Sequence, residues 1–316
     1  MKIFFLGTND FAAEILESLN KIIKIQYVMT KDDSKVGRGQ KLTPSPVKQI
    51  CIKYGIKTHI IETSINSSKE KNFIEKTLPD IIILIGYGEK IDAKIINIPK
   101  YGIINVHPSI LPNLRGATPI EHAIINNLNE TGVSIIKIDN NIDTGPILNI
   151  KKCKITKNDT YDSLFIKLKK ISLTALIDTL KNIDKKTIIA QKQTTHMNRL
   201  LAPKIEKNFY RINWNKPALE INRNIRSTFS KKKHYAEINK HIIKIIETTV
   251  INRIKASHKN LLSGTILKIS TNGIDVKTPE KIIRIKKLQF PGKKITNIPN
   301  ILNSINNKIK SGYKFS

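Results

Sequence analysis

The sequence has few cysteines, few aromatic residues and few acidic residues, and these shortages exclude several classes of protein. Two cysteines in 316 residues, Cys51 and Cys153, cannot cross-link a chain of this size and do not form a metal-ligand cluster. No run approaches the roughly 18 uncharged apolar residues that a membrane-spanning helix needs. The opening apolar run, residues 2–6, is too short for a secretory segment. We therefore expect a soluble, cytoplasmic protein with neither a structural disulfide nor a metal.

Basic residues outnumber acidic ones, so the chain has a formal net charge of +30. Residues 207–316 hold 24 Lys and Arg but only 5 Asp and Glu, a net charge of +19 on about a third of the chain. The abundance of Ile, Lys and Asn indicates drift towards A·T-rich codons, which would raise the Lys content evenly. Because the excess is uneven, we expect a nucleic-acid-binding surface near the C-terminal end, with drift as a background.

Short apolar runs separated by helical patterns predict an α/β domain over residues 1–183. The run at residues 81–85 is Ile-Ile-Ile-Leu-Ile, which is typical of a strand buried on both faces. Apolar residues at helical spacing over residues 160–181 predict a long amphipathic helix. Alternation of strands and helices indicates a mostly parallel, doubly wound sheet. The predicted strands cover residues 2–6, 25–29, 81–85, 102–106 and 132–138.

The rest of the chain is predicted to form a linker and a small β domain. Residues 184–206 are polar, contain Pro203 and are the best linker candidate. Residues 207–316 contain several short strand-like runs separated by turns, which predicts a small OB-like β-barrel. The runs cover residues 242–246, 264–269, 273–277 and 282–285.

An amide and an imidazole stand two residues apart at the end of a predicted strand. Asn105 and His107 should point to the same face, because side chains alternate along a strand. Open α/β sheets bind ligands at the carboxyl ends of parallel strands, and Pro108 ends the strand at this point. For this motif alone, a capping asparagine and a structural histidine are the alternative.

A carboxylate follows the strand predicted at residues 132–138. Asp143, in the sequence Ile-Asp-Thr-Gly, should lie in a loop at the same end of the sheet as His107. There it could accept a hydrogen bond from the imidazole, which would fix the tautomer and favour the protonated ring. The alternative is an Asx-type turn without a chemical role.

Residues 30–48 are predicted to form a long basic loop. A loop of this length without secondary structure is usually functional or disordered. Arg38 stands between two glycines, which suits a guanidinium that contacts phosphates. A solvated surface loop is the alternative. The sequence contains no dinucleotide fingerprint and no phosphate-binding P-loop motif. The other basic candidates in this loop are Lys35, Lys41 and Lys48.

The order and spacing of four short motifs resemble those of one known family. The motifs are Asn105-Val106-His107, then Ser109-Ile110-Leu111-Pro112, Arg115-Gly116 and Asp143-Thr144-Gly145. Together they resemble the signature of folate-dependent formyltransferases. The opening Gly7-Thr8-Asn9-Asp10, the basic loop and the C-terminal β domain are similar to the members that formylate methionyl-tRNA. The resemblance runs essentially from end to end.

This resemblance implies a Rossmann-like formyltransferase domain, a reaction and a role for each motif. The formyl group of the co-substrate 10-formyltetrahydrofolate would pass to the α-amine of initiator methionyl-tRNA, held at its acceptor end, without a metal. Residues 207–316 would bind tRNA, and the protein would act as a monomer. The implied catalytic residues are Asn105, His107 and Asp143, the folate-contacting residues are Ser109, Ile110, Leu111 and Pro112, and the tRNA-contacting residues are Lys35, Arg38, Lys41 and Lys48.

Two segments depart from the family pattern. Glu89 and Lys90 stand beside the expected folate pocket where the family has apolar residues, and residues 230–234 carry three lysines in place of an aromatic, proline-containing segment. We expect looser packing at the second segment. The alternatives are a formyltransferase for a small molecule, a 10-formyltetrahydrofolate hydrolase, and a tRNA-binding protein with a degenerate site. The basic loop and tail argue against the first alternative, and the intact trio argues against the last.

Overall fold

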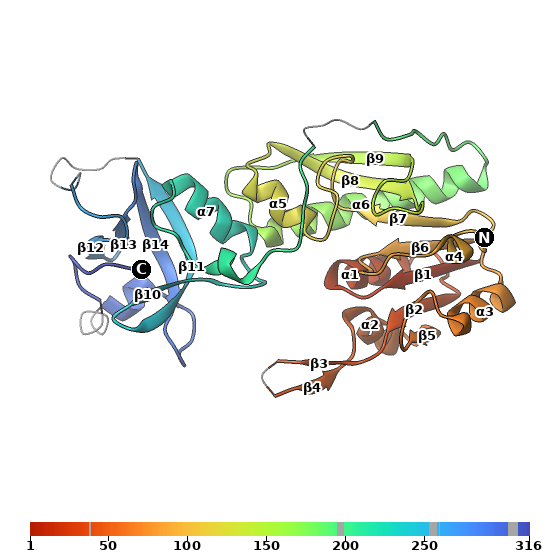
Figure 1. Ribbon diagram of the computed structural model, residues 1–316, viewed down its shortest axis with the longest axis horizontal. Coiled ribbons are helices and arrows are strands. Elements are labelled where there is room, and N and C mark those ends of the chain that lie inside the picture. The colour runs from red at the N-terminus through yellow and green to blue at the C-terminus, as the bar shows by residue number, and fades with distance from the viewer. Residues whose placement is uncertain (38, 195–198, 253–257, 259, 303–308) are drawn as a thin grey trace. The chain divides into compact units, whose positions relative to one another are not determined.

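The chain folds into two compact units, which are described separately (Figure 1). The computed structural model describes residues 1–316 except 38, 195–198, 253–257, 259 and 303–308. The first unit comprises Met1–Pro119, Asn129–Lys154 and Phe165–Pro203. The second comprises Ile120–Leu128, Ile155–Leu164 and Lys204–Ser316.

A seven-stranded sheet forms the centre of the first unit. The first five strands in the spatial order run parallel, and β8 and β9 run antiparallel to their neighbours. The predicted mostly parallel sheet is therefore confirmed. The spatial order is β5 (Thr58–Ile61), β2 (Tyr27–Lys31), β1 (Ile3–Gly7), β6 (Ile81–Ile85), β7 (Ile103–His107), β8 (Glu130–Lys137) and β9 (Ile147–Lys154).

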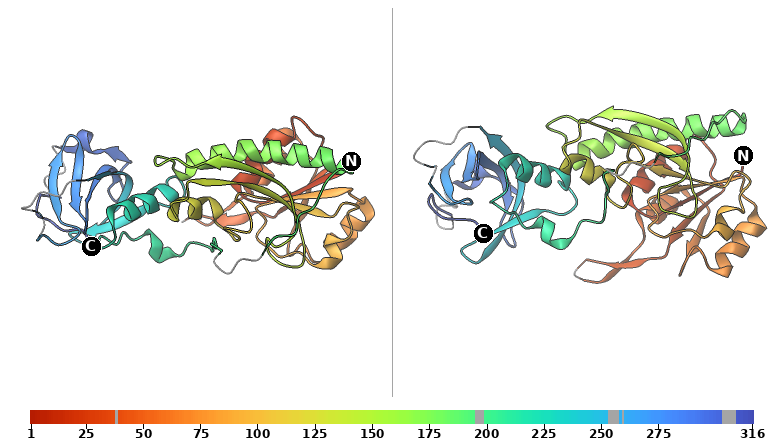
Figure 2. Two further views of the ribbon diagram at one scale, coloured as in Figure 1. Left: turned by 90° about the horizontal axis from the view of Figure 1, so that it is seen from above. Right: turned by 45° about the horizontal axis from the view of Figure 1, so that its top comes forward.

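Helices cover both faces of this sheet (Figure 2). Asn9 caps the first helix, because its side chain accepts a hydrogen bond from the Ala12 backbone N–H. On one face, Phe11 of this helix packs edge-on against Phe165 of the long predicted helix. On the other face, Phe4 lies in an apolar cluster with residues of α3 and α4. The helices that lie wholly or mostly in this unit are α1 (Asp10–Leu19), α2 (Pro46–Tyr54), α3 (Ser68–Thr77), α4 (Ala93–Ile96) and α6 (Tyr161–Asp184). Helix α5 (Pro119–Ile125) belongs almost wholly to the second unit.

The basic segment at residues 30–48 contains a β-hairpin, the end of β2 and the start of α2, rather than the predicted loop without secondary structure. Strands β3 (Ser34–Val36) and β4 (Lys41–Thr43) pair antiparallel. The turn uses left-handed backbone at Gly37, with φ of 75°, and at Gln40, with φ of 48°. The prediction was wrong because three-residue strands of mostly polar residues show no apolar alternation.

The second unit contains a six-stranded sheet in which all pairings are antiparallel. Helix α7 (Ala218–Ser227) buries Ile221 and Ile225 against the isoleucines of this sheet. The predicted C-terminal β domain is confirmed, and closure of its sheet into a barrel stays a prediction. The strand order is β10 (His234–Ile238), β11 (His241–Ile251), β14 (Ile282–Gln289), β13 (Gly273–Lys277) and β12 (Ile266–Ser270), with β15 (Thr296–Asn297) beside β14. The unit also contains two short 3-10 helices, η1 (Lys207–Tyr210) and η3 (Ile298–Ile301).

Three consecutive lysines occupy the place of the expected aromatic segment, and each lies over an aromatic ring. The ammonium of Lys231 is 4.4 Å from the Tyr161 ring centroid and 2.8 Å from Glu121 Oε1. Burial alone would lower the pKa of Lys231, but Glu121 and Tyr161 outweigh burial and raise this pKa above its usual value. Lys232 and Lys233 lie 4.3 Å and 5.3 Å from the rings of the neighbouring Tyr210 and Phe229. Cation–π contacts thus replace aromatic packing here.

Candidate active site

Strand β7 presents the predicted amide and imidazole at one place, as its alternation requires. Asn105 and His107 are 8% and 4% exposed, and both approach Asp143. The strand lies inside the sheet between β6 and β8, so its backbone is held on both sides. The predicted shared face of these two residues is confirmed.

Asp143 reaches the site by a route that the sequence did not predict. Because β8 is antiparallel to β7, its end at Lys137 lies opposite Ile104, away from the carboxyl end of β7. Residues 138–146 then fold back, and the Lys137 N–H donates to the Pro146 carbonyl at 3.0 Å. A Cβ at Gly145 would lie 1.7 Å from the Lys137 oxygen, so this return requires glycine. Asp143 itself has a left-handed φ of 55°.

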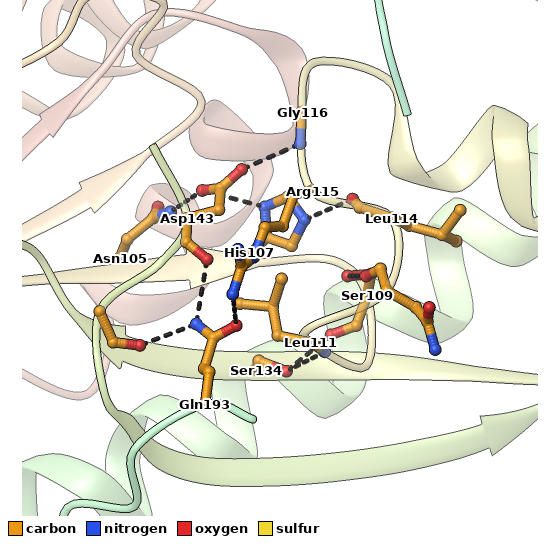
Figure 3. Close-up of polar contacts among 12 residues, drawn as sticks. Asn105, His107, Ser109, Leu111, Leu114, Arg115, Gly116, Ser134, Asp143 and Gln193 are labelled. Carbon is orange, nitrogen blue, oxygen red and sulfur yellow. Dashed lines mark hydrogen bonds and ion pairs between the residues drawn. The ribbon is translucent and has the colours of Figure 1, made fainter. Parts of the chain in front are cut away.

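The Asp143 carboxylate is held from two directions (Figure 3). Its Oδ1 accepts a hydrogen bond from Asn105 Nδ2 at 3.2 Å, and its Oδ2 accepts one from the Gly116 backbone N–H at 3.0 Å. His107 Nδ1 is 3.6 Å from Oδ1, which is an ion-pair distance rather than a hydrogen bond. The three predicted side chains therefore form one cluster with the carboxylate at its centre.

The tautomer of His107 is set by a partner other than the expected Asp143. His107 Nε2 is 2.9 Å from the Leu114 carbonyl oxygen. Since a carbonyl only accepts hydrogen bonds, Nε2 carries a proton and donates to it. The expected hydrogen bond from His107 to Asp143 does not form, because Nδ1 is 3.6 Å from Oδ1 and the proton of the neutral ring is on Nε2. In the neutral ring, Nδ1 consequently offers a lone pair towards Asp143.

Gln193, which lies in the segment predicted as a linker, supports the Asp143 loop from behind. Its Nε2 donates to the carbonyl oxygens of Asp143 at 2.9 Å and Gly145 at 2.7 Å (Figure 3). Its Oε1 accepts from Arg115 Nη2 at 2.5 Å. The side chain is 8% exposed. The sequence alone does not indicate this residue, because a single glutamine in a polar segment shows no periodicity or motif.

A pocket opens beside Asn105 and Asp143. Glu89, one of the two unexpected charges, lies in its wall, and its carboxylate accepts hydrogen bonds from Tyr87 at 3.2 Å, from Asn66 at 3.4 Å and from Ser64. Burial, followed by the Glu89 charge, raises the pKa of Tyr87 well above its usual value. The lining residues are Leu84, Tyr87, Glu89, Lys90, Ile91, Asn105, Ile136, Ile138, Asp139, Asn141, Ile142, Asp143 and Gly145.

The described part of the chain contains neither a candidate metal site nor a candidate membrane span. Across residues 1–316 without the gaps given above, no three or more His, Cys, Asp or Glu side chains are grouped to hold a metal ion. Within the same residues, no helix is both long and apolar enough to cross a membrane.

Two family models match successive parts of the sequence. Residues 1–180 match the model of the formyl transferase family, and residues 204–306 match the formyl transferase C-terminal domain. The chain belongs to the formyl transferase family.

Among relatives in this family are two bacterial proteins named methionyl-tRNA formyltransferase. The protein from Buchnera aphidicola subsp. Acyrthosiphon pisum (strain Tuc7) is 37% identical over 313 residues, which cover 99% of this chain and 98% of the relative. The protein from Caldicellulosiruptor saccharolyticus is 35% identical over 316 residues, which cover 99% of both chains. Both alignments therefore include the active-site domain and the basic C-terminal unit.

Solved structures with the same fold include two proteins of lower identity. HypX from Aquifex aeolicus in complex with tetrahydrofolic acid has a TM-score of 0.64 at 14% identity; the match covers 99% of this chain and 50% of HypX, so the chain spans about half of HypX. The N-formyltransferase from Helicobacter canadensis has a TM-score of 0.64 at 23% identity, with 90% of this chain and 99% of that chain covered. At these identities the likeness establishes the fold.

The segment expected to contact folate in this formyl transferase is fixed by one buried serine of β8. Ser134 Oγ accepts from the Leu111 backbone N–H at 3.0 Å and donates to the Ser109 carbonyl at 2.8 Å. Ser109 and Leu111 are buried, whereas Ile110 and Pro112 are partly exposed. Of the four expected residues, only Ile110 and Pro112 are therefore accessible from outside, and none of the four lines the pocket beside Asn105 and Asp143.

The four basic residues expected to contact tRNA fall into three groups. Lys35 and Lys41 are exposed on the β3–β4 hairpin, at positions one residue out of direct register. Lys48 forms ion pairs with Asp33 at 2.5 Å and Asp32 at 3.4 Å, and the Asp33 hydrogen bond raises the pKa of Lys48. Arg38 lies outside the described residues. Lys48 thus has local carboxylate partners that Lys35 and Lys41 do not share in the described part of the hairpin.

Proposed function

We propose that this formyl transferase moves the formyl group of 10-formyltetrahydrofolate to the α-amine of initiator methionyl-tRNA. The observation that carries the chemistry is the Asp143 carboxylate, which Asn105 and Gly116 hold beside His107 at the edge of a pocket. The acceptor is favoured by the two relatives named methionyl-tRNA formyltransferase, which align over 99% of this chain at 35% and 37% identity. An enzyme that formylates a small molecule would not need the basic C-terminal unit.

The proposed reaction exchanges one carbon–nitrogen bond for another. The amine of methionyl-tRNA attacks the formyl carbon, a carbon–nitrogen bond forms, and the carbonyl oxygen becomes an oxyanion. The bond to the folate nitrogen then breaks, and the proton lost by the amine passes to that nitrogen. Asn105 has one amide N–H on Asp143, and its second N–H is available for the oxyanion. The Asp143 carboxylate is proposed to receive this proton and to return it to the folate nitrogen.

His107 has a restricted part in this scheme. Its Nε2–H is committed to the Leu114 carbonyl, so only Nδ1 can act on the reacting groups. We propose that His107 Nδ1, which is 3.6 Å from Asp143 Oδ1, contacts the reacting groups while Leu114 fixes the orientation of the ring.

We propose that the pocket beside Asn105 and Asp143 contacts one part of the folate co-substrate, because its volume of 80 Å³ is too small to enclose the whole molecule. Leu84, Ile91, Ile136 and Ile138 provide apolar walls of the kind that hold a flat ring. The Glu89 carboxylate is satisfied by three neighbouring donors, so it does not place an unmatched charge in the pocket. When bound, the co-substrate supplies the formyl group, and these residues orient it.

The excess positive charge of the second unit supports tRNA as the partner, even when the ion pairs within the unit are subtracted. In the second unit, Arg284 pairs with Asp275 at 2.6 Å, and Lys287 pairs with Glu247 at 2.6 Å. With only 5 Asp and Glu against 24 Lys and Arg in residues 207–316, most cations of this region have no carboxylate of their own. Such cations bind phosphates and release counterions.

We propose that the protein acts as a monomer in the cytoplasm. All the residues proposed for catalysis come from one chain, so the site needs no second copy. Charged tRNA is made and used in the cytoplasm. Light scattering at the concentrations used for activity assays tests the first point, and a stable dimer would contradict it.

A formylation assay tests the proposed function. Purified protein, 10-formyltetrahydrofolate and methionyl-tRNA should yield formylmethionyl-tRNA, whereas uncharged tRNA should not be modified. Folate turnover without tRNA serves as the control for a hydrolase. Turnover of folate that does not depend on methionyl-tRNA would contradict the proposal.

A further inference from the structure

Two backbone groups that hold the active-site side chains come from one short stretch of chain, residues 113–118. The Leu114 carbonyl accepts a hydrogen bond from His107, and the Gly116 N–H donates one to Asp143 (Figure 3). Leu114 has a left-handed φ of 60°, a conformation that a residue with a bulky side chain rarely adopts. Such a conformation costs about 1–3 kcal/mol and persists only where the surrounding structure imposes it. A neighbouring part of the chain is therefore needed to hold Leu114.

Residues 200–203, which we call the supporting segment, pair in parallel with residues 113–118. Both stretches belong to the first unit, although the supporting segment was predicted as part of a linker. The N–H of Leu114 is bonded to this segment and its carbonyl to His107, so both polar groups of its left-handed backbone are held. The backbone hydrogen bonds between the stretches run from the Leu114 N–H to the Leu200 carbonyl at 2.7 Å, from the Ala202 N–H to the Arg115 carbonyl at 2.8 Å and from the Thr118 N–H to the Ala202 carbonyl at 3.1 Å.

The pairing leaves no room for a side chain where Gly116 faces the supporting segment. A Cβ at Gly116 would lie 2.5 Å from the Ala202 carbonyl oxygen. The φ of Gly116 is 122°, in a region that favours glycine. Ala202 is fully buried, so the supporting segment packs into the first unit at this point. The position of the Gly116 N–H, and with it that of the Asp143 carboxylate, depends on this close contact.

Two side chains fasten the supporting segment at its ends. At its start, Asn113 Oδ1 accepts a hydrogen bond from the Leu200 N–H at 3.1 Å. At its end, Thr118 Oγ1 donates one to the Pro203 carbonyl at 2.6 Å. Asn113 is exposed and Thr118 is half-buried, so substitution of either leaves the buried core of the unit intact. These two side chains can be changed while the backbone groups that hold His107 and Asp143 stay in the protein.

We propose that the supporting segment positions His107 and Asp143 for formyl transfer, and that Asn113 and Thr118 are positioning residues because they fasten it. When the segment is released, Leu114 can leave its left-handed conformation and turn its carbonyl away from His107. A displacement of about 1 Å at a reacting group can lower a rate roughly 100-fold, so a loosened segment has a measurable effect. The inference rests on the proposed function, since formyl transfer is the reaction whose rate it explains.

Thr118→Val in the full chain is the first test, because it removes the hydroxyl donor and keeps the branched shape of the side chain. It should lower kcat roughly 3- to 10-fold, the effect of one lost hydrogen bond, and leave the KM for both substrates unchanged. Thr118→Ser keeps the donor and should restore kcat. Thr187→Val is the matched control, since the exposed Thr187 also donates to a backbone carbonyl, that of Asn182 at 3.4 Å. A raised KM with unchanged kcat would place Thr118 in substrate binding and overturn the proposal.

Variants of Asn113 test the other end of the supporting segment. Asn113→Ala removes the acceptor of the Leu200 N–H and should lower kcat by a similar factor, whereas Asn113→Asp keeps an acceptor and should not. The double variant Asn113→Ala with Thr118→Val releases both ends, and its kcat should fall roughly 10- to 100-fold. A double variant that is folded by circular dichroism and has the kcat of the wild type would overturn the proposal.

Amide hydrogen exchange tests the positioning without any substrate. The N–H groups of Leu114 and Gly116 are both hydrogen-bonded in the wild type, so their exchange reports local opening of this stretch. In the double variant both should exchange at least roughly tenfold faster, whereas the amides of β6, inside the sheet, should exchange as in the wild type. Faster exchange throughout the first unit would mean that the substitutions destabilise the fold as a whole, and this result would overturn the proposal.

Failure of this inference and failure of the proposed function give different results. If the wild type formed no formylmethionyl-tRNA, the proposed function would fail, and the exchange measurement would still decide whether the supporting segment holds Leu114 and Gly116. If the wild type and the double variant formylated methionyl-tRNA at equal rates and had equal amide exchange, only the positioning role of the segment would be refuted.

Discussion

Gln193 holds Asp143 by its backbone, with Nε2 2.9 Å from the Asp143 carbonyl oxygen. This contact joins the segment predicted as a linker to the loop that carries the proposed proton acceptor. Because Asp143 has a left-handed φ of 55°, its conformation depends on such external support.

Gln193→Ala should lower kcat by roughly 10- to 100-fold, because a small displacement of Asp143 removes it from the reacting groups. The KM for methionyl-tRNA should change little. Gln191→Ala is the matched control, since Gln191 is exposed and two residues away. Steady-state kinetics with both substrates test whether kcat falls while KM stays unchanged. A rise in KM with unchanged kcat would mean that Gln193 supports binding rather than the position of Asp143.

Asp143→Asn should reduce formylation by roughly 100- to 1,000-fold while leaving the fold intact. The amide cannot receive a proton, and its N–H₂ would face either Asn105 or the Gly116 N–H, both of which are donors. Asp178→Asn removes a carboxylate from a surface ion pair with Lys151 and serves as the control. Single-turnover rates and circular dichroism are the measurements. Near-wild-type rates for Asp143→Asn would exclude Asp143 from proton transfer.

Ser134→Ala should raise the KM for 10-formyltetrahydrofolate and lower the free energy of unfolding by about 1–3 kcal/mol. The reason is that the Leu111 N–H and the Ser109 carbonyl lose their buried partner, so residues 109–112 are no longer held. Ser172→Ala is the control, because Ser172 is equally buried and its hydroxyl has no partner in the described structure. Urea denaturation and folate titrations would detect the difference. Equal effects of the two variants would contradict a specific role for Ser134.

Stability should fall as the pH drops from 7 towards 4, in part because of His234. Burial lowers its pKa in the folded state from 6.5 to about 4, so the unfolded chain binds a proton that the folded protein does not. This difference removes up to about 3 kcal/mol of unfolding free energy over that range, and the loss begins near pH 6.5. His234→Phe should show a shallower pH dependence in urea denaturation, whereas variants of the exposed His241 should match the wild type. Parallel curves for wild type and His234→Phe would contradict the assignment.

The parts of the fold and site that the sequence predicted depend on local patterns. The pairing of Asn105 with His107 follows from strand alternation, and Pro108 marks the strand end without any knowledge of the neighbours. The run at residues 81–85 reads as a doubly buried strand because its apolar residues are uninterrupted. Asp143 was predicted as a site residue because it follows a predicted strand and because Asp143-Thr144-Gly145 resembles a family motif.

The parts that the sequence did not predict depend on distant partners. The antiparallel direction of β8 is decided by pairing with β7 and β9, which a single segment does not encode. Leu114 fixes His107 through its backbone carbonyl. Because every residue type has this group, the sequence gives no sign of the contact. Gln193 becomes recognisable only when residues 143 and 193 are seen together.

The return of the chain between Lys137 and Pro146 also fixes the number of residues that this loop can contain. A 3.0 Å hydrogen bond from the Lys137 N–H to the Pro146 carbonyl joins the two ends of this loop. At its base, Gly145 packs so closely against the Lys137 carbonyl oxygen that the two segments cannot shift past each other. One added residue lengthens a chain by about 3.3 Å, which exceeds the tolerance of the contacts that Asp143 makes. Natural variation in this family should therefore substitute residues in the loop freely at its exposed tip and change its length rarely.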